Sequence, residues 1–435
     1  MFIEVKIDRK YIKQIKQSDI EKEITIAGWI EEIRQLGPIT FLILKDSTGE
    51  IQLVAKKQNV NEQTYNLIHK IKKQDSIVVI GVIQSTKSKI NKFELVIKDI
   101  DSIFPISSTL PFDPNEKIKS GLDNRLNSRA LDIKSAKNQA IFHIRHETLK
   151  IIRNFLIENN FVEVNTPKII AEAAEGGSNL FEIDYFKRKA FLAQSPQLYK
   201  EQIIMSLDRV FEIATYFRAE RSHTTKHLNE FTSVDIEVAY IDQEEAMNIC
   251  ENMIVNIIKG LKENCNEYME KLGVSLDIPK DRFERIPYQK IISMLKDSGV
   301  DIKEGEDITD KSLSVLGEKS DDFYFITNWP KEIKPFYIAE NKKTGESESF
   351  DLQFKNLELA SGGTRIHEKN ELEERIKSLN MSTENFKSHL ETFAWGMPPH
   401  AGLGLGFDRL MMILTNQTNI RDVVLYPRDE YRLSP

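Results

Sequence analysis

The stretch GLGLGFDR at residues 402–409 decides the fold more than any other part of the chain. Its glycines alternate with leucines, as on a β-strand whose backbone another molecule approaches closely. From Phe407 to Leu414 the pattern becomes helical, and Arg409 lies near the start of this predicted helix. The spacing is not the G-x-G-x-x-G fingerprint of dinucleotide-binding folds. We therefore expect a strand and a helix that face a ligand, outside a Rossmann fold.

Two further strands are predicted at residues 210–220 and 231–240, around a polar loop. Side chains alternate faces along a strand, so Arg218 and Glu220 share one face of the first strand. One face of the return strand carries Phe231, Ser233, Asp235 and Glu237. Because charges are costly to bury in an apolar core, we expect the shared face to line a polar cleft.

The residues of this hairpin suit a nucleotide. Arg218 can bind a phosphate with its planar guanidinium. Phe231 can stack on a base, and His227 can reach a terminal phosphate from the loop. Together with Arg409, they predict a triphosphate site without a Walker loop. Taken alone, the hairpin fits a solvent-facing ribbon with cross-strand ion pairs about equally well.

The stretch AQSPQLYK at residues 193–200 predicts a helix, with Ser195 as its N-cap and Pro196 at its first position. Gln197 and Lys200, three residues apart, then project to one side. A buried lysine is rare without a partner. Lys200 is therefore expected either to meet an acid or to lie in solvent.

Two later stretches, FDL at 350–352 and LELASGGTR at 357–365, add two carboxylates, a hydroxyl and an arginine. Hard oxygen ligands of this kind suit Mg²⁺ that bridges the phosphates of ATP. A scatter of surface charges is the alternative for these stretches.

The first 104 residues predict an OB-fold. Apolar or alternating runs predict strands at residues 24–33, 39–45, 51–55, 77–84 and 93–104, with a helical pattern at 65–71. Three strands, a helix and two more strands is the element order of this small barrel, which commonly binds single-stranded nucleic acid.

The rest of the chain predicts a linker and a larger domain. The proline-punctuated segment 105–114 opens a linker that we place at 105–134. The domain at 135–435 begins with a long helix at 136–159. Its strands and helices mix without βαβ alternation, which predicts an α+β fold with a helix-flanked antiparallel sheet. Residues 255–345 are more helical and polar, and are expected to be partly an insertion.

Composition limits the classes of function. The 435 residues are 29% charged and 40% hydrophobic, and no apolar run is long enough for a transmembrane helix. The N-terminus lacks the pattern of a secretory signal, and Cys250 and Cys265 have no partners at metal spacing, so we expect cytoplasmic thiols. The net charge is −7, but residues 1–100 hold 17 Lys and Arg against 13 Asp and Glu. A basic module on an acidic body can still bind a polyanion.

The motifs together resemble a known family. FVEVNTP at 161–167 is similar to motif 1 of the class II aminoacyl-tRNA synthetases, residues 217–231 to motif 2, and residues 402–409 to motif 3. The resemblance extends over essentially the whole chain, and is closest to the compact archaeal/eukaryotic aspartyl-tRNA synthetases. HIRH at 143–146 has Arg where the HIGH motif of the other synthetase class requires Gly, and we interpret it as structural.

The resemblance implies roles for individual residues. Arg218, Glu220 and Arg409 would be catalytic. ATP would contact these three residues together with His227, Leu228, Phe231 and Glu358, and the adenine would lie between Phe231 and Arg409. Asp351, Glu358 and Ser361 would hold Mg²⁺. L-Aspartate would contact Glu175, Ser195, Gln197, Lys200, Arg218, Asp235, Ser361 and Arg365.

The resemblance also implies the RNA partner and the oligomeric state. Arg34, Phe41, Gln52 and Glu94 would read the anticodon, and Pro167 would lie in a homodimer interface. The enzyme would charge tRNA(Asp), and possibly tRNA(Asn). Glu31 replaces a tryptophan associated with relaxed archaeal enzymes, and residues 86–90 form the second position that bears on this choice.

Lys200 decides the expected substrate. Two cations facing one pocket, Lys200 and Arg365, match aspartate, whereas neutral asparagine would leave them undercompensated. The asparaginyl relatives lack this lysine, as the resemblance implies. An asparaginyl-tRNA synthetase and a catalytically inactive tRNA-binding paralogue are the alternatives.

Overall fold

The computed structural model describes residues 8–86, 92–115, 120–171, 180–221, 224–279, 282–317 and 322–435. The chain divides into two compact units, Met1–Ser120 and Gly121–Pro435. Glu175 and residues 87–90, which the sequence singled out, lie outside the described residues.

The first unit is a closed barrel with the strand order β1-β2-β3-β5-β4. Its elements are β1 (Glu23–Leu36), β2 (Ile39–Lys45), β3 (Glu50–Lys56), α1 (Glu62–Ile68), β4 (Ser76–Ser85) and β5 (Phe93–Phe104). The predicted strand–helix order is confirmed. The helix begins earlier than expected because the Asn61 side chain accepts a hydrogen bond from the Thr64 amide at 2.8 Å, which caps its first turn.

The second unit is built on a sheet with the order β12-β13-β14-β15-β16-β11-β10-β6 in the described residues. Its strands are β6 (Val162–Glu163), β10 (Arg209–Phe217), β11 (Glu230–Ala239), β12 (Glu284–Pro287), β13 (Phe323–Thr327), β14 (Ser349–Phe354), β15 (Leu357–Thr364) and β16 (His400–Gly406). A smaller sheet contains β7 (Ile169–Ile170), β8 (Glu182–Tyr185) and β9 (Arg188–Leu192).

The predicted antiparallel sheet is confirmed for the strands that matter to function. All pairs from β13 through β10 are antiparallel, whereas β12 with β13 and β10 with β6 are parallel. Two strands of this sheet, β12 and β13, come from the region expected to be partly an insertion, residues 255–345. That region therefore extends the sheet at one edge as well as adding helices.

The helices of the second unit are α2 (Leu122–Asn127), α3 (Arg129–Asp132), α4 (Ala136–Glu158), α5 (Gln197–Leu207), α6 (Gln243–Asn264), α7 (Asn266–Leu272), α8 (Tyr288–Asp297), α9 (Asp310–Gly317), α10 (Lys369–Ser378), α11 (Lys387–Phe393), α12 (Phe407–Leu414) and α13 (Ile420–Val423). Short 3-10 helices lie at Ile12–Gln14, Gln17–Asp19, Lys57–Asn59, Lys331–Ile333 and Thr383–Phe386. Among the described residues, no helix combines the length and apolarity needed to cross a membrane.

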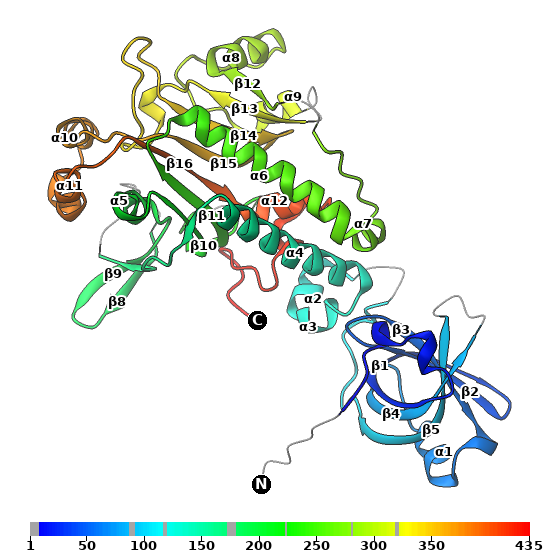
Figure 1. The fold of residues 1–435 in the computed structure, drawn as a ribbon. Helices are drawn as coiled ribbons and strands as arrows, with labels where there is room; N and C mark the ends of the chain where they lie inside the picture. Colours follow the sequence, from blue (N-terminus) through cyan, green and yellow to red (C-terminus); the bar gives the residue numbers. More distant parts are fainter. Residues whose placement is uncertain are drawn as a thin grey trace. The chain divides into compact units, whose positions relative to one another are not determined.

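One face of the large sheet carries the main core. Helix α6 runs across β14, β15 and β16, and α4 packs beside it (Figure 1). The apolar faces of both helices join the inward side chains of the strands in one buried cluster. Cys250 and Cys265 are buried there as thiols, and removal from water raises the pKa of Cys250 to about 12 and that of Cys265 to about 11. The opposite face of the strands remains available for a site.

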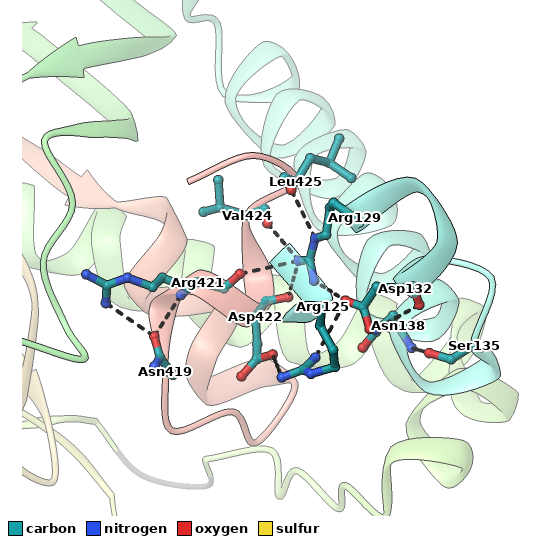
Figure 2. A network of polar contacts seen from close by, with 10 residues as sticks. All are labelled: Arg125, Arg129, Asp132, Ser135, Asn138, Asn419, Arg421, Asp422, Val424 and Leu425. Atoms are coloured by element: carbon teal, nitrogen blue, oxygen red, sulfur yellow. Dashed lines mark hydrogen bonds and ion pairs between the residues drawn. The ribbon is translucent and has the colours of Figure 1, made fainter. Parts of the chain in front are cut away.

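A buried arginine ties the start of this unit to its end (Figure 2). Arg129 on α3 is 1% exposed and donates hydrogen bonds to four backbone carbonyls of residues 421–425. Its Nη1 also meets Asp132 at 2.5 Å. These contacts place α2 and α3 in the second unit, although we expected residues 105–134 to form the linker.

Candidate active site

A pocket of about 360 Å³ lies on the face of the large sheet, within the usual range for small-molecule sites. Most of the residues that the sequence assigns to catalysis, ATP, metal and aspartate line it together: Ser195, Gln197, Arg218, Glu220, His227, Leu228, Phe231, Asp235, Asp351, Glu358, Ser361, Arg365 and Arg409. Lys200 lies behind the pocket wall instead. Residues more than 200 positions apart thus meet at one site.

The predicted hairpin has a different end from the one expected. Strand β10 stops at Phe217, so Arg218 and Glu220 lie in the loop after it and do not share a strand face. The reason is Asn229, whose side-chain amide donates to the backbone carbonyls of Arg218 and Glu220 at 2.7 and 2.9 Å. The Arg218 amide still donates to the Asn229 carbonyl at 2.9 Å, but the Arg218 and Glu220 carbonyls accept from the Asn229 side chain. The Arg218 guanidinium then lies over the Phe231 ring, 5.3 Å from its centroid.

The glycines of β16 make room for the neighbouring strand. A Cβ on Gly402 would lie 2.1 Å from a carboxylate oxygen of Glu237, and one on Gly404 would lie 3.1 Å from Asp235. At Gly402 the close approach comes from the protein itself, which corrects our expectation of a ligand there. Gly404 and Gly406 do line the pocket.

Arg409 joins motif 3 to the loop of motif 2. Its Nη1 donates to the Glu358 carbonyl at 3.0 Å, and its Nη2 lies 2.9 Å from His227 Nε2. The neighbouring Asp408 is buried, pairs with Arg145 at 2.6 Å and accepts from the Thr232 amide at 2.7 Å. Arg145 belongs to the HIRH stretch, so its structural interpretation agrees with these contacts.

Two acidic side chains of the pocket, Asp351 and Glu358, interact electrostatically. Withdrawal from water and the nearby charge of Asp351 raise the pKa of Glu358, against the opposing charges of Arg409, Lys334 and Arg218. Asp351 Oδ2 meets Lys334 at 2.6 Å, whereas its buried Oδ1 has no hydrogen-bond partner among the described residues. An orphaned carboxylate oxygen beside a carboxyl of raised pKa fits a divalent cation. The described residues contain no cluster of three His, Cys, Asp or Glu side chains at metal spacing, so phosphate oxygens or water would complete the set.

Lys200 and Arg365 are paired with the protein's own acids. Lys200 Nζ lies 3.1 Å from Asp235 and 3.3 Å from Glu237. Arg365 donates through Nε and Nη2 to the two oxygens of Glu237, at 2.9 and 3.2 Å. Burial would lower the pKa of Arg365, but the charge and hydrogen bonds of Glu237, together with the charges of Tyr337 and Glu201, raise it. Lys200 therefore meets an acid, which is one of the two alternatives expected for it, and the two cations belong to a buried network with two carboxylates.

Helix α5 carries Gln197 and Lys200, and both are buried. The helix begins at Gln197 with Pro196 as its N-cap, one residue later than we expected. Ser195 therefore precedes the cap residue, and its Oγ accepts a hydrogen bond from the Gln197 amide at 3.4 Å.

The candidate anticodon residues meet on the barrel. Arg34 on β1 lies directly opposite Phe41 on β2, and Gln52 on β3 lies opposite Glu94 on β5. The Gln52 amide donates to the Glu94 carboxylate at 3.0 Å. Glu31 is 8% exposed and accepts a hydrogen bond from Asn115. The side chain that we expect to bear on tRNA choice therefore contacts the segment after the barrel.

Sequence reasoning missed two groups near the pocket. Lys334, which neutralises Asp351, stands in no recognisable motif. The buried Glu201, with His389 and His400, was also missed, because the two histidines lie far from it in the sequence. Glu201 follows Lys200 directly, so a charged residue inside a helix that already carries site residues was the signal available.

Pro167, which we expect at a dimer interface, is exposed between β6 and β7.

Comparison with known proteins places the whole chain. Residues 121–430 match the family model of the class II tRNA synthetases (D, K and N), and residues 24–103 match the OB-fold nucleic acid binding domain. Enzymes of this family use ATP and typically a divalent metal, with a tRNA and an amino acid as partners.

Several relatives are similar over nearly their full length. The Aspartate–tRNA(Asp/Asn) ligase of Methanocaldococcus jannaschii is 45% identical over 98% of both chains, and that of Methanothermobacter thermautotrophicus is 44% identical over 98% of both. The asparaginyl-tRNA synthetase of Pyrococcus horikoshii with asparaginyl-adenylate has a TM-score of 0.94 at 29% identity, covering 99% of this chain and 100% of its own. The putative aspartyl-tRNA synthetase of Leishmania major has a TM-score of 0.86 at 28% identity, with 100% and 97% covered. The chain belongs to the class II aminoacyl-tRNA synthetases of the D, K and N group.

Proposed function

We propose that this chain is an aspartate–tRNA ligase, which activates L-aspartate with ATP and transfers it to the 3′ end of tRNA(Asp). The observation that carries the proposal is the buried network of Lys200, Arg365, Asp235 and Glu237 at the pocket wall. Near-full-length similarity to two aspartate ligases supports it. Because several relatives are named for both tRNAs, we extend the proposal to tRNA(Asn).

The network selects a carboxylate through the donors of Arg365. Glu237 occupies Nε and Nη2, and a guanidinium carries five N–H donors in all. The remaining donors can bind both oxygens of the aspartate side chain, with Lys200 supporting the negative charge from behind. Asparagine would place its own NH₂ donors against them, which leaves buried groups unpaired and lowers its rate steeply.

The amino-acid backbone would lie between opposite charges. Arg218 binds the α-carboxylate, while Asp235, Gln197 and Ser195 surround the ammonium, with Glu175 from the loop outside the described residues. Ser361 completes this wall.

ATP would occupy the other half of the pocket. Phe231 and Arg409 hold the adenine between them, as a stack and a cation–π contact, and Glu220 reads its amino group. His227 and Arg409 meet the γ-phosphate, and Leu228 closes the wall beside them.

Asp351, Glu358 and Ser361 would hold Mg²⁺ against the phosphates. The orphaned oxygen of Asp351 and the raised pKa of Glu358 support a cation there. When bound, it would neutralise the charge on the phosphate oxygens.

The reaction needs no protein nucleophile. The aspartate α-carboxylate attacks the α-phosphorus in line, pyrophosphate leaves, and Arg218 stabilises the charge on the α-phosphate oxygens. The 3′-terminal ribose hydroxyl of the tRNA then attacks the aspartyl-adenylate and releases AMP. The protein contributes positioning and electrostatics.

The barrel at residues 1–104 would bind the anticodon. Phe41 stacks on a splayed base, while Arg34, Gln52 and Glu94 read base edges, as is usual for single-stranded RNA loops. The segment from residue 105 to Ser120 would act as the hinge to the catalytic unit, Gly121–Pro435. Such an enzyme works in the cytoplasm, where tRNAs are used.

The enzyme would be a homodimer through the region of motif 1. Pro167 is exposed, and the nearby apolar residues Val162 and Ile169 are 44% and 49% exposed. Light scattering of the purified chain tests this association, since a monomer at micromolar concentration would contradict it.

The rival is an asparaginyl-tRNA synthetase, favoured by the TM-score of 0.94 with that enzyme of Pyrococcus horikoshii. Amino-acid-dependent ATP–pyrophosphate exchange separates the two. We expect aspartate to drive exchange and asparagine to leave it at background; the reverse result would refute the aspartate assignment. Charging tRNA(Asp) and tRNA(Asn) side by side then defines the RNA range, and no charging of tRNA(Asn) would refute the extension to that tRNA.

A further inference from the structure

A buried charged cluster lies behind the amino-acid side of the pocket and has no role in the chemistry proposed above. Glu201 on α5 is 0% exposed, and its Oε2 lies 3.5 Å from His389 Nε2 on α11 and 3.8 Å from His400 Nε2 at the start of β16. His389 and His400 are 1% and 0% exposed. A carboxyl group in such a place is costly unless its partners hold it.

Two histidines face the Glu201 carboxyl group. Burial would raise the pKa of Glu201, but its interactions with His389 and His400 together outweigh burial and lower it. His400 Nδ1 lies 2.8 Å from the Pro398 carbonyl, which can only accept, so this ring nitrogen carries the proton. The amide of Gln202 meets His389 Nδ1 at 3.1 Å. The charge of Arg365 also acts on Glu201.

A hydrogen bond to Glu201 orients the Gln197 side chain. Gln197 Nε2, one turn earlier on α5, donates to Glu201 Oε1 at 2.5 Å, so the amide presents its NH₂ group to the carboxyl group. The amide carbonyl oxygen is then the atom of Gln197 left for the pocket, which Gln197 lines together with Ser195 and Asp235.

We propose that Glu201 is a positioning residue that fixes the Gln197 amide, so that its carbonyl oxygen accepts a hydrogen bond from the ammonium of the amino-acid substrate. An ammonium has three donors and no acceptor, so a reversed amide would oppose it with NH₂. The Nε2 atoms of His389 and His400 lie beside the other oxygen of Glu201, Oε2. This inference rests on the proposed function, because it takes the amino-acid pocket as given.

The test measures the Michaelis constants of the full chain in ATP–pyrophosphate exchange. In Glu201→Ala, the Gln197 amide can turn, and we expect the KM for aspartate to rise about tenfold, the usual scale for one hydrogen bond to a charged group. The KM for ATP and the kcat should stay within about twofold. Glu201→Gln keeps the volume and one acceptor, and should show a smaller rise.

Succinate separates positioning from general damage, because it has the two carboxylates of aspartate but no ammonium. Its inhibition constant should be the same in the wild type and in Glu201→Ala, while the KM for aspartate rises. An equal loss for succinate and aspartate would overturn the proposal, since the whole pocket would then have changed shape. An unchanged KM for aspartate in Glu201→Ala would overturn it as well.

A double-mutant cycle tests the route through Gln197. Gln197→Ala and the double variant Gln197→Ala/Glu201→Ala should have equal aspartate KM values, because Glu201 has then lost the group on which it acts. Additive effects would contradict the proposal. Glu212→Gln is the matched control, because Glu212 is also buried, pairs with Lys168 and does not line the pocket. That variant should lower the melting temperature without raising the aspartate KM.

Exchange by the wild-type protein tests the proposed function separately from the role of Glu201. If asparagine rather than aspartate drives wild-type exchange, the aspartate assignment fails. The same variants are then measured with asparagine, whose ammonium is identical, and with succinamate in place of succinate. If Glu201→Ala proves insoluble, the Glu201→Gln comparison decides alone, with an unchanged ratio of aspartate KM to succinate inhibition constant as the contradicting outcome.

Discussion

Two buried arginines of the catalytic unit differ in the partners that hold them. Arg129 uses Nε, Nη1 and Nη2, mostly on backbone carbonyls of residues 421–425 (Figure 2). Arg365 is 2% exposed and binds Glu237 through Nε and Nη2, while it lines the pocket. A guanidinium saturated by fixed carbonyls can only hold the fold together. One that is bound by a single carboxylate keeps donors for a ligand.

The largest effect on activity should follow from replacing Arg365, the arginine of the pocket. Arg365→Leu leaves Glu237 buried without its main partner and removes the donors for the substrate carboxylate. We expect the aspartate-dependent exchange rate, as kcat/KM, to fall by about 10³-fold or more. Arg365→Lys is the control, and it should recover little, since lysine lacks the planar fork. A loss below tenfold in Arg365→Leu would show that its donors are not used by the substrate.

Arg129→Leu should break the fold rather than the chemistry. Removing the guanidinium leaves several carbonyls unpaired and leaves Asp132 with the longer ion pair to Arg125 at 3.5 Å, so the free energy of unfolding of the catalytic unit should fall by about 3–5 kcal/mol. Denaturant titration measures this change, and the exchange rate per folded molecule should stay at the wild-type value. Arg153→Leu is the control, because Arg153 forms an exposed pair with Glu163 that should contribute about 0–1 kcal/mol. An activity loss in stable Arg129→Leu protein would contradict the comparison.

Glu358 extends the comparison to a buried acid in the pocket that we expect to bind a cation. Its pKa is raised above the ordinary 4.5, so the protonated carboxyl favours the fold. This contribution is complete below pH 4.5 and is lost as the pH rises through the folded pKa of Glu358. A cation should restore it, so Mg²⁺ should raise the melting temperature more at pH 8 than at pH 5.

Glu358→Gln should abolish this pH dependence of the Mg²⁺ effect. Potassium chloride at equal ionic strength serves as the control for screening. The interpretation of the two acids as a cation site would be refuted if Mg²⁺ shifted the melting temperature equally at both pH values.

The smallest effect is expected on the barrel, which shares no part of the pocket. Phe41→Ala removes one stacking surface, which is worth about 1–3 kcal/mol per base, so the KM for tRNA should rise roughly tenfold. Exchange in the absence of tRNA should not change. Phe104→Ala, which removes an exposed aromatic ring at the end of β5, is the control and should leave the tRNA KM unchanged.

Local pattern was sufficient for most of the elements, whereas the resemblance to a family supplied the expected membership of the site. Alternation along residues 24–104 predicted the barrel strands, and the glycine alternation at 402–406 predicted β16, because strand periodicity is written into neighbouring residues. The ends of the strands were predicted less accurately than their positions in the chain. Arg218 left the strand because Asn229, eleven residues later, bonds its carbonyl.

The sequence by itself determined the fold class, the order of the motifs and most of the residues that meet in the pocket. Only the tertiary structure decided how their charges are balanced. Lys200, Glu237 and Arg365 become partners because the register of β11 against β16 and the seat of α5 bring them together. Glu201 meets His389 and His400 for the same reason. Such pairings join residues far apart in the chain, and no local periodicity encodes them; they follow from packing and from the cost of leaving a buried charge without a partner.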